Sequence, residues 1–386
     1  MKIKQEPDVR FPAFNDDWKE YKADSIFYSV SDKNYPELPV LSASQEKGMV
    51  FRKDIGIDIQ YDENSTKTYK RVIPGQFVIH LRSFQGGFAF SDIEGITSPA
   101  YTVLDFKNKD IHDSYFWKSI LTSKNFIKRL ETVTYGIRDG RSISFNDFST
   151  LKFKVPNYSE QLEISSFFKT IDNLLIYRQQ ELATLKQIKQ GFLQKMFPKE
   201  GESVPELRCP GFINKWEIFK VSDVANMFNN LRVPVTASDR IKGATPYYGA
   251  NGIQDYVEGY THDGEFVLIA EDGASDLINY PVKYVSGKVW VNNHAHVLSG
   301  KKGAIDNYFL ATRINFMNIV PYLVGGGRTK LNGETLKKIP IKMPSFEEQI
   351  KIGDFFKQLD EVIALHQQEL DALKQTKKAF LQKMFI

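Results

Sequence analysis

A segment of 42 residues that occurs twice constrains the fold more than any other feature of the chain. Residues 156–197 read PNYSEQLEISSFFKTIDNLLIYRQQELATLKQIKQGFLQKMF, and residues 344–385 read PSFEEQIKIGDFFKQLDEVIALHQQELDALKQTKKAFLQKMF. The copies align without a gap at an offset of 188 residues, and 22 positions are identical. A solenoid needs at least three repeats, so two long copies predict a molecule of two similar halves about an internal pseudo-twofold axis.

Both copies have apolar residues at alternating steps of three and four, which is the heptad spacing of coiled-coil helices. The predicted seam comprises Ile164, Phe168, Ile171, Leu175, Leu182 and Leu185 in the first copy and Ile352, Phe356, Leu359, Ile363, Leu370 and Leu373 in the second. Capping-box spacings, Asn157-x-x-Glu160 and Ser345-x-x-Glu348, mark the two helix starts. We expect two helices of roughly 55 Å that pair antiparallel within one chain. A zipper between two chains is the alternative.

The remaining sequence forms two modules, residues 1–155 and 199–343, each predicted to combine strands with one amphipathic helix. Runs rich in β-branched and aromatic residues predict strands at 76–81, 100–106, 265–270 and 288–298. The amphipathic helices are expected at about 113–130 and 307–322, each followed by a turn rich in glycine. The modules are therefore predicted to be α+β.

The chain lacks the common sequence signatures of catalysis. The single cysteine, Cys209, excludes a disulfide framework and a cysteine-based zinc site. The chain has no P-loop, no Rossmann glycine motif and no nucleophile elbow. His294-x-His296 has the spacing of two metal ligands on a strand face, but a structural role is the stronger interpretation, and we expect no metal. Glu271 and Asp272 lie in a glycine-flanked turn, which explains them better than catalysis does.

The distribution of charge and apolar residues restricts the setting in which the chain works. No apolar stretch of 18 residues exists and the N-terminus has no apolar signal core, so we expect a soluble cytoplasmic protein without a membrane partner. The net charge is only +4. Residues 113–155 nevertheless carry 8 basic and 4 acidic groups, and residues 306–343 carry 6 and 2. These two basic segments predict two small positively charged patches.

The whole chain resembles the specificity subunit of type I restriction–modification systems. The repeated element P-x-x-x-E-Q-x-x-I…F-F…Q-Q-E-L…L-K-Q…F-L-Q-K-M-F is similar to the two spacer regions of that family. Residues 246–253, 263–273 and 287–297 resemble one subtype of its target recognition domain, and residues 39–44, 85–86 and 98–103 resemble another. The resemblance implies two pseudo-twofold-related α/β target recognition domains (1–155 and 199–343) separated by two long antiparallel coiled-coil helices (156–198 and 344–386).

The resemblance further implies that each domain reads one half of a bipartite asymmetric site in double-stranded DNA. The helix pair would set the spacer between the halves. Two methyltransferase (modification) subunits would dock on it, and restriction (translocase) subunits would join for cleavage. The chain itself would be non-catalytic and bind no cofactor, with S-adenosylmethionine, ATP and Mg²⁺ held by the partner subunits. A duplicated coiled-coil scaffold that binds proteins and no DNA is the alternative.

A protein that reads base edges places polar side chains such as Arg, Lys, Asn or Gln in a groove of DNA. Each module offers candidates for this role. The candidates are Arg52, Arg82, Ser83, Gln85, Arg138 and Arg141 in the first module and Tyr247, Asn251, Arg328, Thr329 and Lys330 in the second. For each of them, a solvated loop residue is the alternative.

Overall fold

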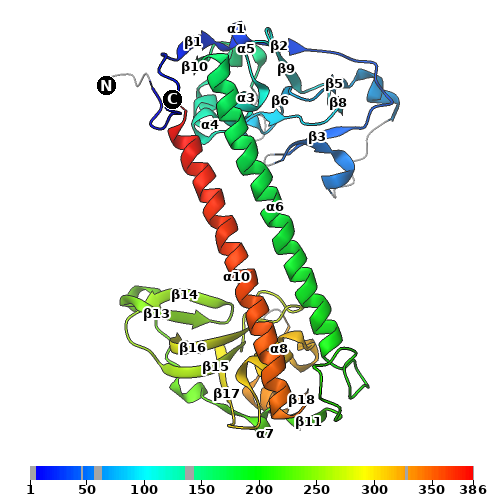
Figure 1. Cartoon of the computed structure of the whole chain (residues 1–386), viewed down its shortest axis with the longest axis vertical. Helices are drawn as coiled ribbons and strands as arrows, with labels where there is room; N and C mark the ends of the chain where they lie inside the picture. The colour runs from blue at the N-terminus through cyan, green and yellow to red at the C-terminus, as the bar shows by residue number, and fades with distance from the viewer. Residues whose placement is uncertain (1–5, 45–46, 56–62, 135–142, 327–328, 386) are drawn as a thin grey trace. The chain divides into compact units, whose positions relative to one another are not determined.

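Each copy of the duplicated segment forms one long helix: α6 (Tyr158–Met196) and α10 (Phe346–Lys383). The computed structural model describes residues 6–44, 47–55, 63–134, 143–326 and 329–385. It divides into two compact units. Unit 1 comprises residues 1–179 and 369–386, and unit 2 comprises residues 180–368. Each unit thus contains one module together with part of both long helices (Figure 1).

Unit 1 is built on small antiparallel sheets and short helices. The strands are β1 (Lys19–Lys22), β2 (Phe27–Val30), β3 (Leu41–Ser44), β4 (Gly48–Phe51), β5 (Lys70–Val72), β6 (Phe77–Ile79), β7 (Ala89–Phe90), β8 (Gly95–Thr97), β9 (Thr102–Phe106) and β10 (Lys152–Val155). The α-helices are α1 (Ala23–Ile26), α2 (Ser83–Gly86), α3 (Ser114–Leu121), α4 (Lys124–Leu130) and α5 (Phe145–Ser149). The central sheet has the order β2-β9-β6-β7, and β1 pairs with β10.

Unit 2 is built on one larger sheet of six strands. Its strands are β11 (Glu217–Lys220), β12 (Ala225–Met227), β13 (Lys242–Gly249), β14 (Gly252–Val257), β15 (His262–Ala270), β16 (Val282–Val291), β17 (Ala295–Gly300) and β18 (Pro340–Met343). The α-helices are α7 (Val221–Val224), α8 (Asn307–Phe316) and α9 (Gly333–Lys338). The sheet order is β12-β17-β15-β16-β13-β14, with β13 parallel to β16, while β11 pairs with β18.

The predicted strands are present, but two predicted elements are each divided by a side-chain hydrogen bond. The run 288–298 is not one strand, because Asn292 Oδ1 accepts from the amide of His294 at 2.8 Å and turns the chain between β16 and β17. The helix expected at 113–130 is two helices, α3 and α4. The Ser123 hydroxyl accepts from the amide of Phe126 and caps the start of α4. The helix expected at 307–322 ends at Phe316, and the 3₁₀ helix η7 (Val320–Tyr322) follows. Polar capping residues therefore override the apolar period at these places.

The first seam residues of each long helix are buried in the core of a module. Ile164 and Phe168 join the buried aromatic core of unit 1, beside Trp117. Ile352 and Phe356 join the corresponding core of unit 2. A fully buried Phe contributes about 1.5–3 kcal/mol, so apolar burial helps to hold each helix to its module. The twelve predicted seam residues are all buried or partly buried.

Within each unit, α6 packs antiparallel to α10 with the same contacts. In unit 1, Phe167 meets Phe380 with ring centroids 4.9 Å apart, and Arg178 lies 3.9 Å from Glu369. In unit 2, the equivalent Phe192 and Phe355 are also 4.9 Å apart, and His366 lies 3.9 Å from Glu181. These contacts confirm pairing within one chain and do not support a zipper between two chains.

A Tyr–Asp–Lys triad joins the module helix to both long helices in each unit. In unit 2, Asp360 on α10 accepts from Lys189 of α6 at 2.5 Å and from the hydroxyl of Tyr308 of α8 at 2.8 Å. Asp172 of unit 1 accepts in the same way from Lys377 and from Tyr115, the latter at 2.5 Å. Burial first, and the carboxylate second, raise the pKa of each tyrosine, so both hydroxyls stay protonated donors.

A buried ion pair ties the start of each module to the start of a long helix. Arg10 contacts both oxygens of Glu160 at 2.8 Å, and Arg208 contacts those of Glu348 at 2.8 and 2.7 Å. The capping box is therefore only half formed at the first helix: Asn157 Oδ1 caps the amide of Glu160, but the Glu160 carboxylate faces Arg10.

In the described part of the chain, no helix is long and apolar enough to cross a membrane.

Candidate nucleic-acid interface

Several loops of unit 2 converge at one edge of the six-stranded sheet, which we call the loop edge (residues 250–252, 271–280, 292–294, 324–326 and 329–331). The Asn251 side chain donates to the carbonyl of Gly273 at 2.9 Å and accepts from the amide of Ser275 at 2.8 Å. The amide of Leu331 donates to the carbonyl of Glu271 at 2.7 Å, and Asp272 and Lys330 form an antiparallel bridge. Loops that are far apart in sequence are thereby held as one surface.

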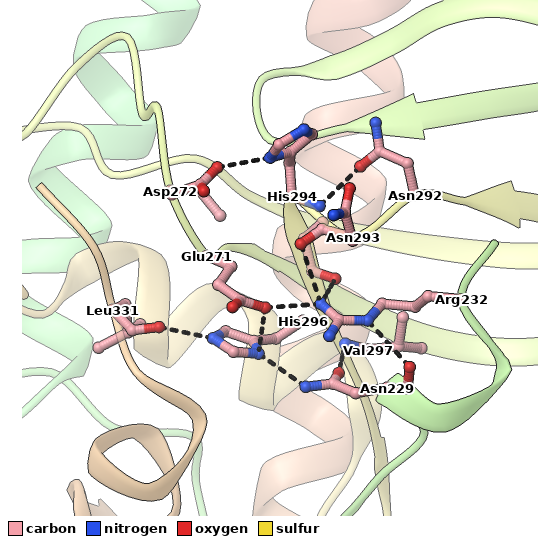
Figure 2. Close-up of polar contacts among 12 residues, drawn as sticks. Asn229, Arg232, Glu271, Asp272, Asn292, Asn293, His294, His296, Val297 and Leu331 are labelled. Carbon is pink, nitrogen blue, oxygen red and sulfur yellow. Dashed lines mark hydrogen bonds and ion pairs between the residues drawn. The ribbon is translucent and has the colours of Figure 1, made fainter. Parts of the chain in front are cut away.

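Glu271 is the charged centre of the loop edge (Figure 2). Its carboxylate accepts from Arg232 at 2.7 Å and pairs with Lys330 at 2.9 Å. Arg232 also donates to the carbonyls of Asn229 and Ala295. Burial by itself raises the pKa of Glu271, but the hydrogen bonds from Arg232 and Lys330 outweigh burial, and the net pKa is lowered. Glu271 therefore stays ionised and fixes the turn that bears Lys330.

The two histidines of the His-x-His motif have separate partners. His296 is buried and lies 2.7 Å through Nε2 from the carbonyl of Leu331, so Nε2 carries the proton. Nδ1 then accepts from the Asn229 amide at 2.9 Å. Burial lowers the pKa of His296, which keeps the ring neutral. His294 instead contacts Asp272 at 2.6 Å (Figure 2). Among the described residues, no group of three or more His, Cys, Asp or Glu side chains is placed to hold a metal ion.

The structure brings three predicted residues of the second module, Asn251, Thr329 and Lys330, to the loop edge. Asn251 is exposed, although its amide also joins two loops. Tyr247 lies elsewhere. Its ring is buried beneath Arg240 and Trp290, and its hydroxyl bonds to the backbone of Val235, so its side chain cannot reach a base edge in this structure.

Arg328 lies outside the described residues.

The predicted residues of the first module gather partly at the helical turn α2. Arg82 and Gln85 are exposed there, while Ser83 is buried and its hydroxyl accepts from the amide of His80 at 2.8 Å. Ser83 therefore supports the turn instead of facing a ligand. Gly87 ends the turn with φ +80°, and a Cβ there would lie 2.3 Å from the carbonyl oxygen of Leu121, so only glycine fits.

The other predicted residues of the first module lie away from α2 or outside the described chain. Arg52 is partly buried and donates to the hydroxyl of Ser42 at 3.2 Å. Arg138 and Arg141 lie outside the described residues.

Part of the positive charge counted in the two basic segments is buried or paired in the described residues. In residues 306–343, Arg313 is partly buried against the ring of Phe197, and burial lowers its pKa to about 10. Lys330 and Lys337 pair with acidic side chains. In residues 113–155, Lys118 and Lys152 likewise pair with Asp92 and Glu20. A count of charges misses both burial and pairing, so the described part of these segments offers less positive surface than expected.

Two groups of exposed apolar side chains were not singled out from the sequence. One is Ile278, on the loop edge; the turn signature Ser-Asp-Leu-Ile-Asn at 275–279 is the signal that could have indicated it. The other lies on the long helices at equivalent positions of the duplication. These positions are Leu162 and Ile350, Leu174 and Val362, and Tyr177 and Leu365. Their heptad positions outside the seam could have indicated them.

Comparisons with known proteins agree on one family. The family model described as "Type I restriction modification DNA specificity domain" matches residues 15–187 and 213–375. A putative type I restriction enzyme specificity subunit from Haemophilus influenzae is 50% identical over 145 residues, which cover 38% of this chain and 37% of that protein. The specificity subunit of the type I restriction enzyme MjaVIII from Methanocaldococcus jannaschii is 22% identical, over 76% of this chain and 74% of that protein.

Solved structures are similar to the chain over nearly its full length. The crystal structure of a type I restriction–modification S subunit from M. genitalium covers 99% of both chains with a TM-score of 0.68 and 15% identity. A chain from a structure of a type I restriction–modification system, described in terms of complex assembly and conformational transition, covers 95% of this chain and 97% of its own with a TM-score of 0.52 and 13% identity. At these identities the similarity concerns the fold.

Proposed function

The chain belongs to the family of type I restriction–modification DNA specificity subunits, and from this premise we propose that its two units read the two halves of one bipartite site in double-stranded DNA. The observation that carries the proposal is the contrast between the repeated and the divergent parts. The helix contacts, the triads and the Arg–Glu pairs recur in both units. The sheets and loops of the modules differ. A common scaffold with two different surfaces suits two different half-sites.

In unit 2, we assign base reading to the loop edge. Its exposed polar side chains include Asn251 and Asn279, and amides of this kind pair with adenine in the major groove. In unit 1, we assign it to the α2 turn, where Arg82 and Gln85 are exposed. Tyr247 and Ser83 are left out of the proposed contacts because both are buried.

The helix pair is proposed as the spacer that sets the distance between half-sites. A helix of 39 residues such as α6 is about 58 Å long at 1.5 Å per residue. At 3.4 Å per base pair, this length corresponds to about 17 base pairs of duplex. Half-sites must then lie within that distance of one another.

The exposed apolar positions shared by α6 and α10 are the proposed docking sites of two methyltransferase subunits. Equivalent pairs such as Leu174 with Val362 and Tyr177 with Leu365 are exposed in both helices. Identical partners need identical surfaces, and the duplication supplies two. Restriction subunits would join this assembly. S-adenosylmethionine, ATP and Mg²⁺ would bind to the partner subunits, and the chain itself would be non-catalytic.

The test is reconstitution with the cognate methyltransferase subunit. We expect the complex to methylate duplex DNA at one bipartite motif, and neither component to do so alone. Substitution of Leu174 and Val362 by Glu should prevent assembly, whereas Glu at the buried Ile164 should unfold unit 1. Assembly without any affinity for duplex DNA would support a protein-binding scaffold and contradict the proposal.

A further inference from the structure

The most exposed large apolar side chain of the loop edge belongs to Ile278, in the loop between β15 and β16. Its side chain is 86% exposed. The turn beneath it is ordered by Asp276, whose Oδ1 accepts from the amides of Ile278 at 2.8 Å and of Asn279 at 2.9 Å. The Asn279 side chain donates to the other oxygen of Asp276 at 2.9 Å. These bonds thus order the backbone that bears an aliphatic side chain exposed to water.

Both ends of this loop are anchored in the protein. At the far end Tyr280 is buried and its hydroxyl donates to the carbonyl of Ala270 at 2.9 Å. At the near end Asn251 bonds to Gly273 and Ser275. A single exposed aliphatic residue is ordinary on a protein surface. One held at the tip of a doubly anchored turn, with polar groups around it, has a defined position from which to contact a ligand.

The loops of the loop edge expose both apolar and polar groups. Ile253, Leu277 and Val324 are exposed on the same loops or directly beside them. Asn251 and Lys330 lie on those loops as well. A ligand for this face must therefore offer small apolar groups among hydrogen-bond acceptors and donors. The major groove of DNA has this character, because each thymine displays a 5-methyl group beside the polar base edges.

We propose that Ile278 is a specificity residue that contacts the 5-methyl group of a thymine in the half-site read by unit 2. This inference rests on the proposed function and names one base that unit 2 would read. Insertion of Ile278 between base pairs is less favoured, because unstacking a step costs a few kcal/mol that extra phosphate contacts must offset. Lys330, the lysine of the loop edge, is already paired with Glu271. A methyl contact needs no unstacking.

The test is a double-mutant cycle between protein and DNA methyl groups, using the chain in complex with its methyltransferase subunit. Each thymine of the half-site is replaced by uracil, which removes only the 5-methyl group. We expect one replacement to weaken binding by wild type about fourfold, the equivalent of one buried methyl group. Ile278→Ala should bind the thymine duplex correspondingly more weakly and show no further loss with uracil at that position.

The matched control is Ile213→Ala. Ile213 is equally exposed, at 87%, but lies outside the loop edge, so this variant should keep the full uracil effect. Circular dichroism melting establishes that both variants are folded.

Three results would overturn the thymine contact: no uracil effect in wild type, an unchanged uracil effect in Ile278→Ala, or a half-site without thymine. Brightening of 2-aminopurine on binding, without a uracil effect, would indicate insertion instead. If wild type shows no specific binding at all, the proposed function fails, and the thymine contact fails with it.

Discussion

Replacement of Asp360 by Asn should loosen the attachment of the second module to the helices. Asp360 joins three elements of unit 2: it accepts from Lys189 on α6 and from Tyr308 on α8, and it lies on α10. Asn retains an acceptor for the tyrosine hydroxyl but removes the negative charge. Lys189, whose side chain is 23% exposed, then faces an amide instead of a carboxylate.

The magnitude follows from the two hydrogen bonds. A hydrogen bond to a charged group contributes about 1.5–3 kcal/mol, and a neutral one about 0.5–1.5 kcal/mol. Loss of the charge therefore removes about 1 kcal/mol from each bond. The expected destabilisation of unit 2 is about 2 kcal/mol, which is roughly a 30-fold change in the ratio of folded to unfolded protein.

Amide hydrogen exchange at increasing denaturant concentrations measures the change in unfolding free energy in each unit separately. Asp360→Asn should lower amide protection in α8 and the adjoining part of unit 2 and leave unit 1 unchanged. Asp172→Asn should do the reverse. Glu361→Gln removes a neighbouring exposed charge of the same helix and should change little. Protection of unit 2 within about 0.5 kcal/mol of wild type in Asp360→Asn would refute the role assigned to the triad.

Further predictions concern groups that the structure places in defined environments. Glu271→Gln should destabilise unit 2 at neutral pH in urea titrations, because folding lowers the pKa of Glu271. The difference in unfolding free energy from wild type should have its full value above the ordinary carboxyl pKa of 4.5. It should vanish as the pH falls through the lowered pKa. Gly87→Ala should destabilise unit 1 by more than 1 kcal/mol in thermal melts, whereas alanine at Gly201, where a Cβ meets no atom, should cost less. Glu348→Gln should cost about 3 kcal/mol, because it leaves Arg208 without its buried counter-charge, and proteolysis should then release the start of the second module first.

The long helices could be predicted from the sequence because their signal is local. Heptad positions such as Leu182 and Leu370 report the buried face of a helix whatever the partner is. Even there, the sequence did not indicate that Phe167 and Phe355, one position before the seam residues Phe168 and Phe356, make the contacts across the pair. The seam residues at these places are turned into the module cores.

The loop edge could not be predicted because residues distant in sequence build it. Lys330 meets Glu271 across 59 positions of chain, and no periodicity connects them. The burial of Tyr247 and Arg313 was missed for a related reason: residue type indicates what a side chain can bind, whereas exposure depends on the fold. Asn251 is exposed, as a DNA contact would have to be, but its bonds to a neighbouring loop are visible only in three dimensions.

Sequencing of the DNA methylation pattern in cells that contain the chain and its methyltransferase subunit tests the central claim most directly. The comparison is between wild type and a chimaera in which residues 199–343 come from another family member. We expect one bipartite motif for wild type, and for the chimaera a motif that differs in one half-site only, with the same spacer length. A change in both half-sites, or no methylated motif with wild type, would contradict the central claim.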